Sequence, residues 1–328
     1  MIDDRRISVA PMMNWTDRHC RYFHRLLHPQ ACLFTEMIHA NAVINGDRDY
    51  LLGFNDAEHP VVVQLGGNHP ATLARAAVIC AEHGYDEINL NIGCPSERVQ
   101  IGDFGACLMA QPQLVGECIA AMKAAVNVPV SVKTRIGIDA HDSYDFLHTF
   151  IAEVVAAGAD VIVVHARIAI LSGLSPKQNR EVPPLNYSRV ARIVAEFPDV
   201  PVILNGGICG LGQIKEALET YVGVMLGRAA YHNPWLLAQI AAQWQIQKTP
   251  PDRETAVRQF IPYMRQQCEA GVPLHKMTRH ILGLYQGQRG ARAWRRHLSE
   301  NSHRSKADVS VVEAAMSLVD HGSVITYK

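Results

Sequence analysis

Eight short runs of β-branched residues alternate with helical runs between Ile7 and Gly227, and this alternation constrains the fold more than any other feature. Several of the runs are almost continuously apolar, which is typical of parallel strands buried on both faces. The expected strands are Ile7–Ala10, Cys32–Glu36, Val61–Leu65, Glu87–Asn91, Val130–Thr134, Val161–His165, Val202–Asn205 and Val224–Gly227. Eight such β-α units predict an α/β fold of the (β/α)8 TIM barrel type. A doubly wound sheet is the competing architecture, but no Gly-x-Gly-x-x-Gly follows the first run.

Helical patterns fill the gaps between the strands, at Thr72–His83, Gln113–Val126, Tyr144–Ala157 and Tyr187–Glu196. Beyond Pro234 only helical patterns remain, because the apolar run Val324–Tyr327 is too short to add a strand. The expected helices there are Trp235–Gln247, Glu254–Ala270, His275–Leu284, Ala291–Glu300 and Asp308–Val319, with proline and glycine breaks between them. We therefore expect a TIM barrel over residues 1–240, followed by a small all-helical domain over residues 241–328.

The composition of the 328 residues is that of an ordinary globular protein. Lys and Arg together number 31, as do Asp and Glu, so the net charge indicates no partner. The eight cysteines form no Cys-x-x-Cys pair and no zinc-ligand spacing. No signal-peptide core and no long apolar run appear. We expect a cytoplasmic protein with reduced thiols that acts as a monomer, without a metal and without a membrane.

Polar residues and glycines gather where the expected strands end, which is where TIM barrels carry their chemistry. Polar side chains at the ends of apolar strands are costly to bury without partners, and six of the eight strands end in this way. The set consists of Gln64, Asn89, Asn91, Cys94, Lys133, Arg135, His165, Arg167, Asn205, Gly206, Gly207, Gly227 and Arg228. Pro11, Met12 and Met13 follow the first strand.

The last two strand ends indicate a phosphate site. Barrels commonly build such a site from loop amides after strands seven and eight, where glycines let the backbone approach and Arg228 adds charge. A flavin also needs an amide partner for its pyrimidine edge and a cation near N1, where reduction places negative charge. Gln64 suits the first role and Lys133 the second, although Lys133 could instead form an ion pair inside the barrel.

Cys94 lies in the segment Asn-Leu-Asn-Ile-Gly-Cys-Pro-Ser, after the fourth strand. A cysteine thiol ordinarily has a pKa of about 8.5, so at neutral pH it is mostly protonated and can donate a proton. A nucleophilic role would need an activating base, for which His165 is the candidate, and a buried structural cysteine is the third reading.

One segment is strongly basic. Residues 275–306 contain eight basic residues and one acidic residue, a net charge of +7, so the rest of the chain carries −7. Arg292, Arg295 and Arg296 can share one helix face. A neutral protein with a basic helical module is a plausible binder of a polyanion such as RNA.

These stretches together resemble the tRNA-dihydrouridine synthases. The match comprises Ala-Pro-Met-Met-Asn-Trp-Thr-Asp-Arg at 10–18, Gln-Leu-Gly-Gly at 64–67, the Cys94 segment at 89–96, Val-Lys-Thr-Arg-Ile-Gly at 132–137, His-Ala-Arg at 165–167 and Asn-Gly-Gly-Ile at 205–208. Two further stretches, at 173–180 and 290–296, are similar to the A subfamily.

The resemblance implies a bound FMN, NADPH as the reductant, and hydride delivery from flavin N5 to uracil C6, while Cys94 protonates C5 from the opposite face. It implies that the flavin contacts are Pro11, Met12, Met13, Gln64, Lys133, His165, Asn205, Gly206, Gly207, Gly227 and Arg228. It also implies that Asn91 touches the flipped uridine, that Lys177 and Arg180 meet the tRNA, and that the modified positions are 20 and 20a of the D loop.

The chain departs from the family pattern after Arg167, where Ile168, Ile170 and Ser172 stand in place of an expected lysine, an aromatic residue and often a basic residue. This loss of charge is expected to weaken tRNA docking.

Two other functions compete. An FMN barrel oxidoreductase of a free pyrimidine or other small molecule explains the strand ends but leaves the basic segment unused. A non-catalytic RNA-binding protein explains the basic segment but leaves the strand ends unused.

Overall fold

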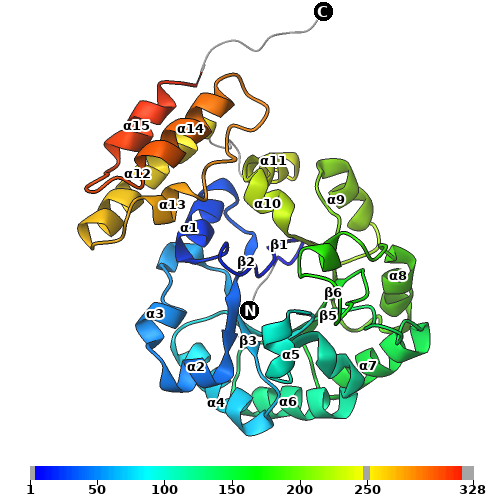
Figure 1. The fold of residues 1–328 in the computed structure, drawn as a ribbon. Coiled ribbons are helices and arrows are strands. Elements are labelled where there is room, and N and C mark those ends of the chain that lie inside the picture. Colours follow the sequence, from blue (N-terminus) through cyan, green and yellow to red (C-terminus); the bar gives the residue numbers. More distant parts are fainter. Residues whose placement is uncertain (1–3, 247–251, 320–328) are drawn as a thin grey trace, which may run out of the picture. The chain divides into compact units, whose positions relative to one another are not determined.

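The first unit of the structure, a computed structural model that describes residues 4–246 and 252–319, is a closed barrel of parallel strands (Figure 1). Each strand pairs with the next in chain order, and β1 pairs with β8 to close the ring. The strands are β1 (Ile7–Val9), β2 (Cys32–His39), β3 (Val61–Gly66), β4 (Glu87–Ile92), β5 (Val130–Arg135), β6 (Val161–His165), β7 (Val202–Asn205) and β8 (Gly223–Leu226). The closed ring confirms the (β/α)8 architecture and excludes the doubly wound sheet.

The strands form because their residues are buried on both faces. Every residue of β3, β4, β6, β7 and β8 is buried, and β-branched side chains dominate β3 and β6. Inside the ring, an apolar cluster draws Phe34, Val62, Val163 and Met225 from four different strands. The barrel is therefore a packed core rather than a pore, and its polar residues stand at the rim and in one interior layer described below.

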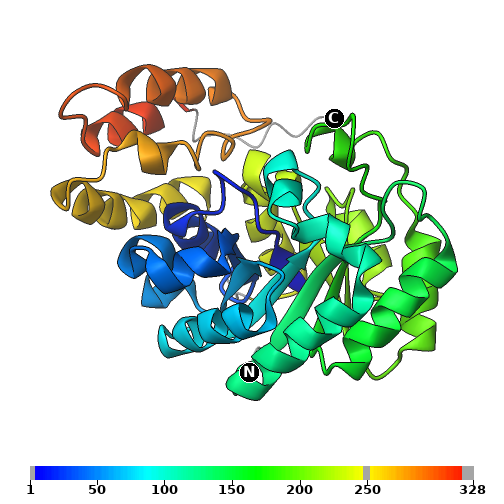
Figure 2. The same cartoon turned by 60° about the horizontal axis from the view of Figure 1, so that its bottom comes forward.

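Helices surround the ring of strands (Figures 1 and 2). They are α2 (Ala40–Asn45), α3 (Arg48–Leu52), α4 (Pro70–Glu82), α5 (Glu97–Ile101), α6 (Pro112–Ala125), α7 (Tyr144–Ala156), α8 (Tyr187–Glu196) and α9 (Leu211–Ala217), with short 3-10 turns at Asp56–Glu58, Gly105–Ala110 and Gln178–Arg180. Pro at the first position starts α4 and α6, and the Ser143 side chain caps α7. Each long helix buries one apolar side, such as Leu147, Phe150, Ile151 and Val154 of α7.

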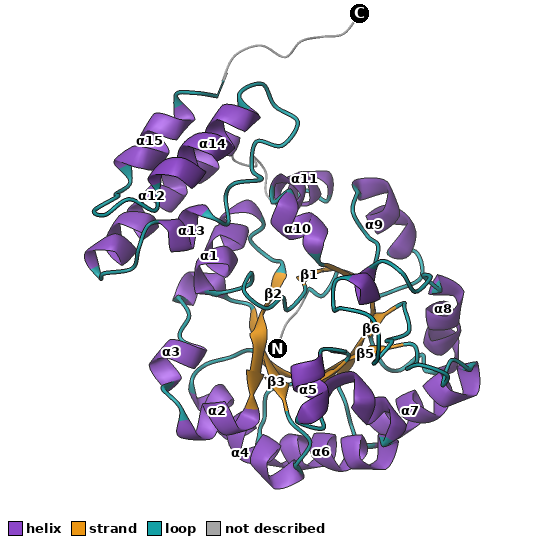
Figure 3. Cartoon of the chain, in the orientation of Figure 1, coloured by secondary structure: helices purple, strands orange, loops and turns teal. Residues whose placement is uncertain are grey.

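The second unit is helical, as the secondary-structure colouring shows (Figure 3). It combines residues 19–29 with the chain from Arg228 onward. Its helices are α1 (Arg18–Leu27), α10 (Arg228–His232), α11 (Trp235–Gln243), α12 (Arg253–Glu269), α13 (His275–Thr278), α14 (Ala291–Asn301) and α15 (Ser310–Met316). The domain boundary expected at residue 240 stays a prediction, and the run Val324–Tyr327 lies outside the described residues.

Within this unit, α1 packs on α12 although some 240 residues of sequence separate them. The rings of Tyr22 and Tyr263 stack at 3.9 Å, and His19 Nδ1 lies 2.7 Å from the Tyr263 hydroxyl. No sequence pattern marks α1 as part of the helical unit, because its apolar stripe looks like that of any barrel helix.

The helix predicted over 275–284 is wrong in length, since α13 ends at Thr278. Packing explains the early end. The Trp294 indole donates a hydrogen bond to the Ile281 carbonyl at 3.0 Å, and a Cβ on Gly283 would lie 2.0 Å from the His232 carbonyl oxygen. The chain between α13 and α14 follows these contacts instead of continuing as a helix.

Among the described residues, no helix is both long enough and apolar enough to cross a membrane.

Candidate active site

The polar residues predicted at the strand ends lie together at the carboxyl edge of the barrel. Asn91 on β4 is the register partner of Lys133 on β5, and His165 on β6 pairs with Asn205 on β7. Parallel strands bring their carboxyl ends to the same rim, so residues as far apart in sequence as Lys133 and Asn205 become neighbours.

Lys133 is on β5, and its side chain reaches Asn205 on β7 at this rim. Its ammonium Nζ donates a hydrogen bond to Asn205 Oδ1 at 3.1 Å, and Asn205 Nδ2 donates to the Met225 carbonyl at 2.7 Å. Burial, with a further contribution from Arg135, lowers the pKa of Lys133 to about 7. The cation is costly to hold here, which is expected of a site built to receive a negatively charged or carbonyl-rich group. No acidic partner of Lys133 occurs among the described residues, so the ion-pair reading is not what the structure shows.

His165 is almost fully buried beside several cations. Burial first, and then the charges of Arg135, Lys133 and Arg167, hold the pKa of His165 well below its usual range. The imidazole is therefore neutral at physiological pH and can act as a hydrogen-bond partner but not as a positive charge.

The loop that carries Cys94 is fixed from three sides. Asn91 Oδ1 accepts hydrogen bonds from the backbone N–H of Gly93 at 3.1 Å and of Cys94 at 3.0 Å. Arg135 Nε donates to the Gly93 carbonyl at 3.1 Å, and the Ala106 N–H donates to the Cys94 carbonyl at 3.0 Å. The loop thus has a defined shape that presents a half-buried thiol.

The Cys94 thiol contacts Ser96, with 3.4 Å between Sγ and Oγ, and the described chain contains no hydrogen bond between this thiol and His165. The geometry therefore lacks the thiol–imidazole pair that a nucleophilic cysteine needs. It is compatible with a thiol that gives up a proton to a bound molecule.

The glycines after β7 are required by the backbone. Gly206 and Gly207 have φ values of +109° and +74°. A Cβ on Gly206 would lie 2.5 Å from His165 Cδ2, and one on Gly207 would lie 2.5 Å from Leu185. These two glycines are thus demanded by conformation and close packing, a reason that comes in addition to any approach of a phosphate.

Gly227, which follows β8, is different, since a Cβ there would meet no atom within 4 Å. The backbone after β8 faces open space, and Arg228 follows it as the first residue of α10. After β1, Met12 packs against the barrel core whereas Met13 is 56% exposed.

The predicted tRNA contacts lie on two different elements. Lys177 and Arg180 are exposed on the loop between β6 and α8, and Arg180 is close enough to His165 to contribute to its lowered pKa. Arg292 and Arg295 are exposed on α14, on the side away from the buried Trp294 and Leu298.

Asn179, a buried residue that the sequence argument did not single out, organises the loop containing Ile168, Ile170 and Ser172. Its amide exchanges hydrogen bonds with the Ile170 backbone at 2.7 and 2.8 Å, and Arg135 Nη1 donates to the Ile168 carbonyl at 3.3 Å. Ile168, Ile170 and Ser172, which depart from the family pattern, therefore lie on a loop whose backbone is held by hydrogen bonds.

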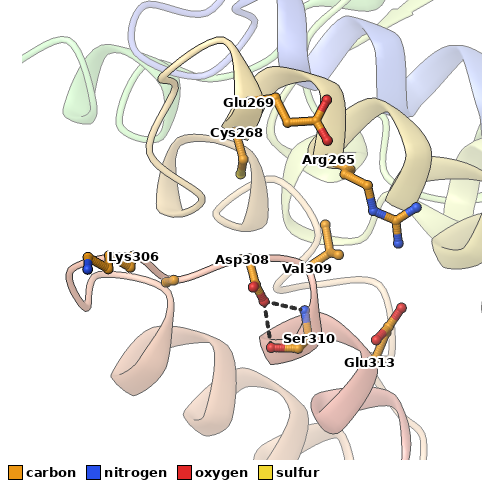
Figure 4. A pocket seen from close by; sticks show the side chains of 9 residues that line it. Arg265, Cys268, Glu269, Lys306, Asp308, Val309, Ser310 and Glu313 are labelled. Carbon is orange, nitrogen blue, oxygen red and sulfur yellow. Dashed lines mark hydrogen bonds between the residues drawn. The ribbon is translucent and has the colours of Figure 1, made fainter.

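A hollow of about 490 Å³ lies elsewhere, in the helical unit between α12 and the start of α15 (Figure 4). Its walls include Arg265, Cys268 and Glu269 on one side and Asp308 on the other, where Asp308 is bonded to Ser310. None of the predicted site residues lines it. Its lining mixes neutral, acidic and basic side chains, so it favours no particular class of ligand.

Comparison with known proteins identifies relatives over almost the entire chain. The family model "Dihydrouridine synthase (Dus)" matches residues 8–320. The tRNA-dihydrouridine(20/20a) synthase of Xanthomonas axonopodis pv. citri (strain 306) is 55% identical over 315 residues, which cover 96% of this chain and 94% of that protein. The tRNA-dihydrouridine(20/20a) synthase of Vibrio cholerae serotype O1 is 52% identical over 318 residues, with 96% and 97% covered.

A solved structure of a 2-naphthoyl-CoA reductase complex superposes with a TM-score of 0.56 at 9% identity, covering 73% of this chain and 50% of that one. This likeness concerns the fold alone.

Proposed function

The chain belongs to the dihydrouridine synthase family, and on that basis we propose that it reduces the C5–C6 double bond of uridine in the D loop of tRNA to 5,6-dihydrouridine. The relatives' names point to positions 20 and 20a as the uridines that it modifies. Because the substrate is tRNA, its proposed place of action is the cytoplasm.

The observation that carries this proposal is the meeting of Lys133, Gln64 and the Cys94 loop at one rim of the barrel. A half-buried lysine suits a ring that gains negative charge, a buried carboxamide suits a pyrimidine edge, and a half-buried thiol suits proton delivery. A non-catalytic RNA-binding protein would need none of these groups.

The residues at the rim fit a bound FMN. Within the described part of the chain, the Lys133 ammonium makes a single hydrogen bond, to Asn205, so two of its three N–H groups remain for a ligand. Gln64 and Asn91 each keep one amide N–H that no described residue uses. These residues would hold FMN, which when bound would supply, from NADPH, the hydride that is added to C6 of the uracil.

The proposed cofactor contacts are Pro11, Met12, Met13, Gln64, Lys133, His165, Asn205, Gly206, Gly207, Gly227 and Arg228. Among them, Lys133 would supply positive charge to the ring when it is reduced, and neutral His165 would offer a hydrogen bond without adding charge. The backbone at Gly207 and Gly227, with Arg228, receives the phosphate.

Within the reaction, Cys94 supplies the proton. Its Sγ–H donates to C5 of the uracil, and solvent later returns a proton to the thiolate. Asn91 fixes the backbone that carries the thiol, and its spare N–H can hold a carbonyl oxygen of the uracil in place.

The tRNA is proposed to contact Lys177 and Arg180 beside the rim and the exposed arginines Arg292 and Arg295 of α14. Bringing the uridine out of its stack costs a few kcal/mol, and such phosphate contacts can offset this cost.

The proposal is tested by mass spectrometry of tRNA from a strain that lacks this gene. We expect dihydrouridine to disappear at positions 20 and 20a, and to return when the wild-type gene is restored. Unchanged dihydrouridine at both positions would refute the proposed substrate.

A further inference from the structure

A single file of hydrogen bonds crosses the interior of the barrel and ends at the Cys94 loop. Gln64, Asn89 and Ser131 are register neighbours on β3, β4 and β5, so they form one layer inside the ring. Glu87 stands two residues before Asn89, and Asn91 two residues after it, so all three share the inward face of β4. All five side chains are buried, with at most 7% exposure.

The donors in this file all run in one direction. The Gly93 and Cys94 N–H groups donate to Asn91 Oδ1, Asn91 Nδ2 donates to Gln64 Oε1 at 2.7 Å, and Gln64 Nε2 donates to Asn89 Oδ1 at 2.7 Å. The file continues from Asn89 Nδ2 to Ser131 Oγ at 2.8 Å and from Ser131 Oγ to Glu87 Oε1. At its far end, Arg5 Nη1 lies 2.5 Å from Glu87 Oε2.

The two ends of the file agree on this direction. At the loop end, backbone N–H groups can only donate, so Asn91 must turn its oxygen toward them. At the other end, Glu87 Oε1 accepts from Ser131, and Glu87 Oε2 forms an ion pair with Arg5, which favours the ionised carboxylate. Burial raises the pKa of Glu87, and Arg5 and Ser131 oppose this rise. The loop end alone fixes the order of the three amides, because reversing them would turn the Asn91 NH2 group against two N–H donors.

We propose that Glu87, Ser131 and Asn89, anchored by Arg5, are positioning residues that set the orientation of the Gln64 and Asn91 carboxamides. Through these two amides they orient the flavin-binding edge and the Cys94 loop together. The inference rests on the proposed function only for what the two amides bind, since the file itself is a feature of the barrel.

The file also limits what Asn91 offers to a base. Its oxygen is filled by two N–H donors and one of its N–H groups is used by Gln64, which leaves one N–H. Asn91 can therefore donate to a pyrimidine carbonyl but cannot accept from a ring N–H.

Ser131→Ala breaks the file next to its Glu87 end, because it removes the acceptor of Asn89 and the donor to Glu87. Ser8→Ala is the matched control. Ser8 is equally buried in a barrel strand, β1, and its hydroxyl has no hydrogen-bond partner among residues 4–246 and 252–319.

The test is hydrogen–deuterium exchange at the Gly93 and Cys94 amides of the purified flavin-loaded protein, followed by kinetics with tRNA. For Ser131→Ala we expect about fivefold to tenfold faster exchange at these amides, in line with weakening one hydrogen bond. We also expect kcat to fall while KM for tRNA stays unchanged. Ser8→Ala should match the wild type in both measurements.

Exchange at Gly93 and Cys94 that is equal in Ser131→Ala and Ser8→Ala would overturn the proposal. If Ser131→Ala does not fold, Asn89→Leu tests the same file, because it removes the acceptor of Gln64 Nε2 and the donor to Ser131. The same faster exchange is expected, and wild-type exchange is the refuting result. The exchange comparison needs no turnover, so it decides the role of the file even if the protein forms no dihydrouridine.

Discussion

At the rim of the barrel, the Cys94 thiol is placed mainly by hydrogen bonds to its backbone, with one long contact from its sulfur to the Ser96 hydroxyl. The Asn91 amide and the Arg135 guanidinium hold the two peptide groups of Gly93, and Ser96 is the contact of the sulfur itself. Such a thiol can approach a bound base without first breaking a strong interaction.

Replacing this thiol should separate reduction of the flavin by NADPH from reduction of the uridine. Cys94→Ala is expected to retain bound flavin and its reduction by NADPH, while dihydrouridine formation slows by about 100-fold or more, the usual contribution of a general acid. Cys107→Ala is the control, because Cys107 is also half-buried but its thiol is bonded to the Phe104 carbonyl. Wild-type turnover in Cys94→Ala would remove Cys94 as the proton donor.

Lys133 gives the site a pH dependence. Its folded-state pKa of about 7 lies below the value of about 10.4 in an unfolded chain, so folding disfavours its protonated form. The resulting penalty on stability is complete below pH 7 and declines as the pH rises toward 10.

The variant Lys133→Met removes this penalty, and the gain should be about 2–3 kcal/mol larger at pH 6 than at pH 9 in the cofactor-free protein. Chemical denaturation at the two pH values measures the difference. A stability difference that is the same at both values would show that Lys133 is not a strained cation.

Several elements follow from the sequence, and the departures have identifiable causes. The run from Val161 to His165 and the helix from Tyr187 to Glu196 have their predicted bounds, because apolar continuity and helical period are local signals. The strand that starts at Cys32 extends to His39 because a register shift between Phe34 and Met37 continues its pairing with β3, which no local pattern reports.

The candidate site likewise contains residues that the sequence predicts and residues that only the fold reveals. Gln64, Asn91, Lys133, His165 and Asn205 could be predicted, since each ends a strand of a recognisable barrel. The contributions of Arg135 and Ser131 could not, because their partners lie about 40 residues away and only the closed register brings them together. The sequence did carry a signal for Glu87. It is a charged residue in an otherwise buried strand, and it precedes Asn89 and Asn91 by two and four residues, so all three side chains point to the same face.

The α14 helix is the element on which tRNA affinity should depend. Trp294 and Leu298 are the buried residues of this helix, and Arg292 and Arg295 are exposed. Arg296 is exposed as well, but it forms an ion pair with Glu300 at 2.9 Å. We expect Arg292→Ala combined with Arg295→Ala to weaken tRNA binding and to reduce the slope of log affinity against log salt by roughly one to two, the value for two lost phosphate contacts.

The matched control for α14 is Arg258→Ala combined with Arg265→Ala on α12, which removes the same charge from exposed positions of the same helical unit. Binding isotherms over a range of salt concentrations measure the slope for both double variants. Equal losses in the two would mean that only net charge matters, and no loss in the first would exclude α14 from the docking surface.

At the scale of the whole molecule, the two compact units contain different kinds of functional residues. The barrel carries the polar rim and the hydrogen-bond file, while the helical unit carries most of the excess positive charge of residues 275–306. A reductase of a small free molecule would have use for the first unit alone. The pairing of a reductive site with a basic helical module is what an enzyme acting on a base within RNA requires.

The proposed function is tested most directly with the purified flavin-loaded protein, NADPH and an unmodified tRNA transcript, in parallel with free uridine. Mass spectrometry of the digested transcript should show dihydrouridine at positions 20 and 20a, with NADPH consumed in equal amount and no reduction of free uridine. Reduction of free uridine as fast as that of tRNA, or NADPH consumption without dihydrouridine in the transcript, would contradict the assignment of this chain as a tRNA uridine reductase.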